Sequence, residues 1–325
     1  MDISDRNSLI IEAKRRLEHA KCNHRHLVMI YAGVMALVMA LASGAIWLLQ
    51  NQIGSTGGLQ GIGMRSLLET ASTVLQVGST ALLPFWTMGY VLCILGVIRG
   101  SRMEPKDLLG GFQRFAPLLR LNLYRVFKYL ILGMLCLYPS IMVYLMTPLA
   151  NPVMEILEPL VQNATDTTQM MAMMDEATAM AVTEAMMPWM AVYGLMFLLL
   201  AAPLYYRLRM ADYILLDNPK LGALQAVRLS TMMTLRKRMQ LFLLDLRFWW
   251  FYGLEIVVQL LCYADLLLPL VGVQLGMNGV LASFLFYALA LVCQVGLYAW
   301  KKPEVFTSYS LFYDDLLSKA QPAAM

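Results

Sequence analysis

Residues 27–49, LVMIYAGVMALVMALASGAIWLL, form an apolar run without a charged side chain. An α-helix rises 1.5 Å per residue, so a run of this length crosses the roughly 30 Å hydrocarbon core of a bilayer. Residues 1–26 precede it as a charged arm, whereas a signal peptide has a short charged region and an apolar core of about 7 to 15 residues. We therefore expect residues 27–49 to be a retained membrane span.

Further apolar runs of similar length follow along the chain. The sequence predicts six transmembrane helices, at residues 27–49, 74–98, 127–146, 188–206, 241–261 and 280–300. The composition agrees, since 59% of the residues are hydrophobic, 14% are charged and the mean hydropathy is +0.61, whereas soluble domains average about 45–50% apolar and about 25% charged residues. We predict an all-α polytopic bundle in a single membrane domain, with an arm (1–26), the bundle (27–300) and a tail (301–325).

The positions of the basic residues predict the orientation of this bundle. Of the 25 Lys and Arg residues, only Arg65 lies in a segment expected on the outer side. Basic residues collect at the cytoplasmic ends of spans, so both termini are expected in the cytoplasm. The basic inner surface favours anionic lipid headgroups as partners. No nucleic-acid-binding motif or aromatic stacking platform accompanies the charge, so a nucleic-acid partner is not expected.

Several cytoplasmic segments have the pattern of basic amphipathic helices. In the arm, Leu9, Ile10, Ala13 and Leu17 recur at helical spacing among basic residues, which is typical of a helix lying in the membrane interface. Three connecting segments begin with proline beside capping residues, a signal for the start of a helix. They begin at Glu104-Pro105, Asn218-Pro219 and Lys301-Lys302-Pro303. This similarity suggests an internal repeat, although short cytoplasmic linkers are often basic and proline-capped for local reasons alone.

Within the fourth connection, basic and apolar residues alternate so that both can meet a lipid surface. Its apolar residues can enter the interface while its cations meet the headgroups. The residues assigned to headgroup binding are Arg228, Arg236, Lys237 and Arg238.

The connection at residues 147–187 is the one long segment expected outside. It contains acids and many methionines but no Lys or Arg. Met170, Met173, Met174, Ala177 and Ala181 would form one apolar face of a helix resting on the bundle. The alternative is that the thioethers bind a soft metal such as Cu(I).

Cysteine and histidine give no recognisable metal or disulfide motif. The five cysteines have no Cys-x-x-Cys spacing, so disulfides are not expected. His19, Cys22, His24 and His26 lie close together, but their spacing matches no standard zinc motif and we expect them to be solvated.

The strongest local signal runs from residue 218 to residue 259. It contains an amphipathic segment, a basic triplet, the sequence LLDLRF at residues 243–248 and the aromatic cluster WWFY at residues 249–252. This stretch resembles an uncharacterised integral membrane family of Gram-positive bacteria, domain of unknown function 975. The family pattern is A-x-x-x-S-x-x-L-M-x-G-x-K, then F-x-L-D-L-S-F-x-x-W, and a tail element F-Y-x-x-L. The residues that match are Ala226, Ser230, Met233, Phe242, Leu244, Asp245, Leu246, Phe248, Trp249 or Trp250, Phe312, Tyr313 and Leu316.

Two departures from the family pattern stand out. Leu235 and Arg236 occupy the region of its glycine, and Arg247 stands where the family has serine. The resemblance implies a multi-span protein of the bacterial plasma membrane. It implies no reaction, substrate or cofactor.

Polar residues form a stripe along the fifth predicted span. Asp245, Tyr252, Glu255 and Gln259, with Cys262 beyond them, fall on one helical face. A central charged residue costs roughly 2.5 to 3.5 kcal/mol in a span, so this face should meet protein or water. One hypothesis is a proton or cation path with Glu255 as its titrating group.

The other hypothesis for this stripe is structural. Asp245 would pair with a basic residue such as Arg247, Arg238 or Lys128, and Glu255 would be hydrogen-bonded in the bundle. If the aromatic cluster at residues 249–252 marks the inner interface, the span begins near Phe248 and Glu255 lies shallower than mid-bilayer.

No catalytic motif is present, since H-E-x-x-H, G-x-S-x-G and Walker A sequences are all missing. No cofactor is expected. We predict a non-enzymatic integral membrane protein, either a permease-like subunit or a scaffold for envelope homeostasis, with a possible membrane-protein partner. The alternatives are a transporter or channel with a polar path along the fifth span, and a lipid-modifying intramembrane enzyme.

Overall fold

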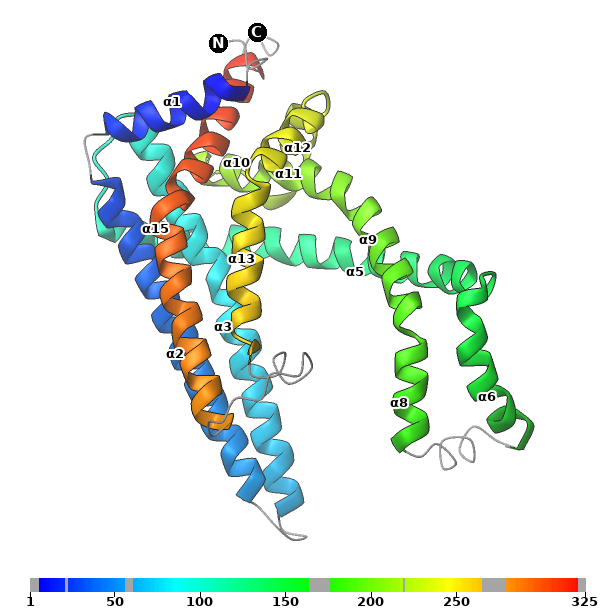
Figure 1. Ribbon diagram of the computed structural model, residues 1–325. Coiled ribbons are helices and arrows are strands. Elements are labelled where there is room, and N and C mark those ends of the chain that lie inside the picture. The colour runs from blue at the N-terminus through cyan, green and yellow to red at the C-terminus, as the bar shows by residue number, and fades with distance from the viewer. Residues whose placement is uncertain are drawn as a thin grey trace. The chain divides into compact units, whose positions relative to one another are not determined.

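The computed structural model describes residues 6–20, 23–55, 61–163, 176–218, 220–264 and 279–320. Every regular element in these residues is a helix, so the all-α prediction is confirmed. The chain forms two compact units (Figure 1), one made of Met1–Leu119 with Met210–Met325 and the other of Arg120–Arg209. Each unit is described by itself.

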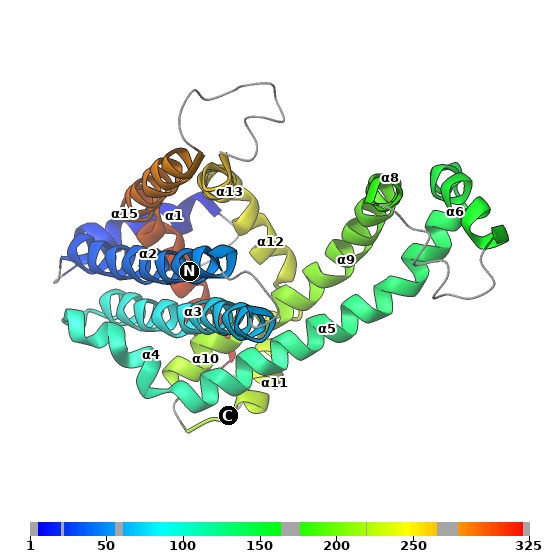
Figure 2. The same cartoon turned by 90° about the horizontal axis from the view of Figure 1, so that it is seen from below.

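The first unit is built around three long helices. Helices α2, α3 and α15 pack together, α13 lies on α15, and α1 crosses the C-terminal part of α15 (Figures 1 and 2). The elements are α1 (Arg6–Glu18), α2 (His24–Ser55), α3 (Gly61–Ile98), η1 (Pro105–Leu109), α4 (Gly110–Gln113), the start of α5 (Phe115–Leu145), α10 (Ala211–Asp217), α11 (Ala223–Thr234), α12 (Arg238–Arg247), α13 (Trp249–Leu261) and α15 (Gly279–Ala320).

The second unit contains the rest of α5 and the helices that follow it. These are η2 (Pro148–Ala150), α6 (Asn151–Asn163), α8 (Glu176–Ala185) and α9 (Met187–Leu208). A small core forms around Tyr144, whose hydroxyl donates to the Ala185 carbonyl at 2.9 Å. Of the predicted methionine face, Met170, Met173 and Met174 lie outside the described residues.

Five helices in the described residues are long and apolar enough to span a membrane. They are His24–Leu49, Ser66–Ile98, Phe115–Leu145, Met180–Asp217 and Ala282–Lys319. The predicted fifth span, residues 241–261, is not one helix, because the chain leaves helical geometry at Phe248 and separates α12 from α13. The apolar part, Trp249–Leu261, is shorter than the other five.

The packed core of the first unit lies at the end that carries α1, which we call the α1 end. Along α3, side chains such as Leu67 and Val74 are about two-thirds exposed, whereas the stretch from Phe85 to Ile98 is mostly buried. In α15 burial becomes nearly continuous from Lys302 to Leu316. The other parts of these helices keep apolar side chains exposed, as expected for surfaces that face lipid.

Helix α1 has the predicted amphipathic pattern but a different partner. Leu9, Ala13 and Leu17 are 5%, 0% and 7% exposed because they pack in the contact of α1 with α15 and α3. The face predicted to enter the lipid interface is therefore buried against protein.

Helix α15 also differs from the sequence prediction. A new helix was predicted to open at Lys301-Lys302-Pro303, but α15 continues unbroken to Ala320 with Pro303 inside it. Proline in a helix interior costs about 3 kcal/mol. Helix α15 packs on α1, α2, α3, α11 and α13, and these contacts can offset this cost.

The two other predicted helix starts have different caps. Glu104 is the N-cap of η1 with Pro105 in the first position, and the Glu104 N–H donates to the Asp107 carboxylate at 2.8 Å. Helix α11 begins later than predicted, at Ala223, where the Gly222 N–H donates to Gln225 at 3.0 Å. Pro219 lies outside the described residues.

The backbones of η1 and α4 approach the backbone of α3 closely at two glycines. A Cβ atom placed on Gly89 would overlap the Leu108 carbonyl oxygen, and one placed on Gly111 would overlap the Phe85 carbonyl oxygen. Helices approach this closely only where glycine removes the side chain, as is common among membrane helices.

Candidate functional site

The polar stripe of α12 and α13 faces α15 at three of its four residues. Asp245 lies in the last turn of α12, while Tyr252, Glu255 and Gln259 lie in α13. Tyrosines of α15 contact the first three, as described below, and Gln259 is exposed. The stripe thus makes two separate contacts with α15, and its last residue, Gln259, is exposed.

The first contact joins Asp245 to Tyr309. The Tyr309 hydroxyl donates to the Asp245 carboxylate and lies 3.1 Å from the hydroxyl of Tyr252. Tyr309 is 3% exposed. Asp245 was predicted to pair with a basic side chain, and the sequence analysis did not consider a tyrosine.

The second contact joins Glu255 to Tyr298. The Tyr298 hydroxyl donates to Glu255 Oε1 at 2.6 Å and accepts a hydrogen bond from Gln294 at 3.1 Å. Glu255 is therefore hydrogen-bonded within the bundle, as the structural hypothesis predicted.

Lys302 lies beside this contact and was missed by the sequence analysis. Its Nζ atom is 3.3 Å from the centroid of the Tyr298 ring, with the rings of Tyr31 at 5.2 Å and Phe306 at 5.8 Å. The side chain is only 8% exposed. An ammonium above aromatic faces is stabilised by their negative charge density. The signal in the sequence is the spacing of Tyr298, Lys302 and Phe306, one helical turn apart.

Tryptophan and lysine side chains cluster next to the Glu255 contact. The rings of Trp250 and Trp300 are 5.6 Å apart, and Lys301 Nζ lies 5.6 Å and 5.5 Å from their centroids. Lys301 also pairs with Glu304 at 2.7 Å. Such clusters are typical of the boundary between membrane and water. Helix α13 starts beside this cluster, at Trp249.

An ion-pair cluster joins three helices at the α1 end. Arg99, just after α3, donates to Asp217 of α10 and to Asp314 of α15 at 2.7 Å. Tyr313 donates to the same Asp217 carboxylate at 3.2 Å. The hydrogen bond to Asp217 raises the pKa of Arg99, so the guanidinium stays charged at any physiological pH. This arrangement joins the end of α3 to α10 and α15.

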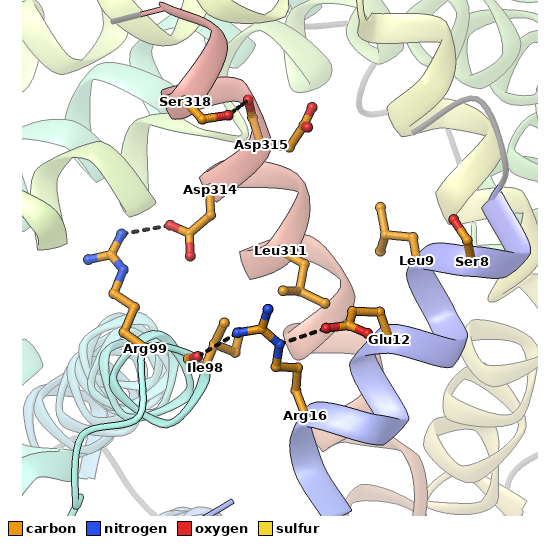
Figure 3. A pocket seen from close by; sticks show the side chains of 10 residues that line it. All are labelled: Ser8, Leu9, Glu12, Arg16, Ile98, Arg99, Leu311, Asp314, Asp315 and Ser318. Carbon is orange, nitrogen blue, oxygen red and sulfur yellow. Dashed lines mark hydrogen bonds and ion pairs between the residues drawn. The ribbon is translucent and has the colours of Figure 1, made fainter. Parts of the chain in front are cut away.

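Two cavities lie on either side of Arg16 at the α1 end. One, of about 310 Å³, is bordered by Glu12 and Arg16 of α1, Arg99, and Asp314 of α15 (Figure 3). The other, of about 480 Å³, is also bordered by Glu12 and Arg16. Arg16, which borders both, pairs with Glu12 at 2.7 Å and donates to the Ile98 carbonyl at 3.3 Å. Glu255 borders neither cavity.

The residues assigned to headgroup binding lie on α11 and at the start of α12. Arg228 and Arg236 are exposed, while Lys237 and Arg238 are partly buried. Four large apolar side chains are exposed on the same helices, each at 61–67%: Leu224, Met232, Leu235 and Met239. Not every apolar residue of this connection faces outward, since Val227 is buried.

Among the described residues, no group of three His, Cys, Asp or Glu side chains could hold a metal ion. His19 Nδ1 lies 2.9 Å from the Arg15 carbonyl, and Cys22 is outside the described residues. Cys136, Cys262 and Cys293 are free thiols.

The comparison with known families covers nearly the whole chain. No curated protein and no solved structure matches it. Residues 5–320 match the family described as Protein of unknown function (DUF975), well beyond the segment around residues 218–259 that carries the strongest motif. The chain is therefore a member of DUF975.

Proposed function

We propose that this chain is a non-enzymatic integral membrane protein of the bacterial plasma membrane, acting as a permease-like subunit or as a scaffold in envelope homeostasis. One observation carries the proposal. Asp245, Tyr252 and Glu255 each contact a tyrosine of α15. Polar groups used in this way join helices, whereas a transport path needs polar groups that face water.

The same observation weighs against the two alternatives. A lipid-modifying enzyme needs an acid and a base that converge on a lipid-sized cleft. Asp245 and Glu255 instead accept hydrogen bonds from different tyrosines, Tyr309 and Tyr298. A transporter along α13 would need water to reach Glu255.

We test this reading by thiol accessibility in a variant without native cysteines. Cysteine at Glu255 should react much more slowly than one at an exposed loop position with a small hydrophilic thiol reagent, because Glu255 is partly buried against Tyr298 of α15. Rapid reaction at both Glu255→Cys and Gln259→Cys would instead support a polar path. The same assay tests topology, since Glu158→Cys should react in intact cells and Lys106→Cys only after lysis.

Anionic lipid is the partner proposed for the basic surface of α11 and α12. Its exposed cations are interleaved with exposed apolar side chains, which suits a membrane interface better than water. The spans already hold these charges at the surface, so lipid contact needs no diffusional encounter.

Neutralising this surface should weaken its attraction to anionic lipid. At about 1 kcal/mol for each charge, Arg236→Gln, Lys237→Gln and Arg238→Gln together remove at most about 3 kcal/mol, and salt lowers this figure. Thermal unfolding in neutral and in phosphatidylglycerol-containing nanodiscs measures the effect. Anionic lipid should stabilise wild type more than the triple variant, and equal stabilisation of both would refute the assignment.

A further inference from the structure

The apolar helix α13 is shorter than the hydrocarbon core of a membrane is thick. Its length alone therefore does not fix how deep it lies in the membrane. It has 13 residues, which as a helix extend about 20 Å, whereas a hydrocarbon core is roughly 30 Å thick. A full-length span is positioned by matching its apolar length to this thickness. A short span can move along the membrane normal, so other contacts must set its position.

Lys302, which is buried, and Glu255, which is partly buried, both contact one tyrosine, Tyr298. The ammonium of Lys302 lies over the Tyr298 ring, and the Tyr298 hydroxyl donates to the carboxylate of Glu255. Lys302 and Tyr298 are one turn apart on α15, while Glu255 belongs to α13. A buried charge is costly unless an opposite charge or hydrogen bonds compensate it.

Among the described residues, aromatic rings from two helices surround the Lys302 ammonium. Tyr31 of α2 and Phe306 of α15 present their rings to Lys302, and Tyr31 stacks on Tyr90 of α3 at 4.6 Å. The neighbouring Lys301 pairs with Glu304. Glu255 is therefore the carboxylate placed to balance Lys302.

We propose that Glu255, Tyr298 and Lys302 form a charge-balanced pin that sets the depth of α13 against α15. Moving α13 by one helical turn, about 5.4 Å, would separate Glu255 from the Tyr298 hydroxyl and leave the buried Lys302 without its nearby carboxylate. The contact between Tyr252 and Tyr309 adds a neutral hydrogen bond but balances no charge. Fixing the register of a helix is the best-attested role of buried polar groups.

The depth of α13 can be measured with a spin label in nanodiscs. Val257 is 60% exposed on α13, so a nitroxide attached there fits without disturbing the core. Power saturation with oxygen and with a water-soluble nickel complex reports how deep the label lies. We would compare wild type with Tyr298→Phe, Glu255→Gln, Lys302→Met and the double variant Glu255→Gln with Lys302→Met.

The pin predicts a specific pattern. Tyr298→Phe keeps the ring and loses only the hydroxyl, and it should shift the label by up to one turn, roughly 5 Å. Each single charge substitution should lower Tm, and the double variant should regain at least half of that loss because no buried charge remains unbalanced. The conservative Lys302→Arg should keep the wild-type depth.

Asp315→Asn is the matched control, because Asp315 pairs with Lys319 within α15 and contacts no other span through that bond. It should change neither depth nor Tm. An unchanged label depth in Tyr298→Phe, with additive effects of the two charge substitutions, would overturn the pin. If Lys302→Met fails to fold, Tyr298→Phe and Lys302→Arg still decide the question.

Discussion

Gly89→Ala and Gly111→Ala should each prevent normal folding of the α1 end. The added methyl group meets a backbone carbonyl, that of Leu108 or Phe85, rather than a side chain that can rotate away. Overpacking in a core typically costs about 1 to 3 kcal/mol, and a clash with fixed backbone falls at or above the upper figure. The measurement is the yield of monodisperse protein and its Tm in mild detergent.

Gly78→Ala is the control for this prediction. Gly78 lies in the same helix, α3, and a Cβ atom there would have no neighbour within 4 Å. Alanine favours helix over glycine by up to about 1 kcal/mol, so Gly78→Ala should be neutral or stabilising. Similar losses for Gly78→Ala and Gly89→Ala would mean that the close approach of η1 to α3 is not what makes glycine necessary.

Tyr309→Ala should destabilise the protein by about 3 to 5 kcal/mol, the usual loss for a large buried aromatic side chain. The ring is almost fully buried, and its hydroxyl joins Asp245 of α12 to Tyr252 of α13. Tyr309→Phe isolates the hydroxyl and should cost about 1 to 3 kcal/mol. Chemical unfolding of each variant in the same detergent gives these free energies.

A double-mutant cycle separates the hydrogen bond from packing. Asp245→Asn and Tyr309→Phe should be clearly non-additive, because each removes the same bond. The pair Asp315→Asn with Tyr309→Phe provides the comparison and should be additive. Additivity in the first cycle would show that the Tyr309 hydroxyl and Asp245 stabilise the fold independently.

Local pattern in the sequence was enough to predict much of the fold. Apolar length located five helices long enough to span a membrane but wrongly predicted residues 241–261 as one helix, and the period of Leu9, Ala13 and Leu17 identified the apolar face of α1. Both signals depend on neighbouring residues only. The partner of that face was missed, because a basic amphipathic helix looks the same whether lipid or protein covers it.

The contacts of the site could not be predicted in the same way. Asp245 and Tyr309 lie far apart in the chain, and only the packing of α13 on α15 brings them together. Lys302 was read as part of a helix start because Pro303 follows it. In the structure α15 continues past Pro303, and residues on both sides of this proline are buried.

The contact of α1 with α15 has a consequence for biosynthesis. The first helix of the chain packs against the last, so roughly 300 residues must be added between them, which takes about 15 to 60 seconds at about 5 to 20 residues per second. During that interval the apolar face of α1 has no α15 to cover it. A basic amphipathic helix is stable on a lipid surface, so we expect α1 to lie there in the nascent chain until α15 is made and takes over its apolar face.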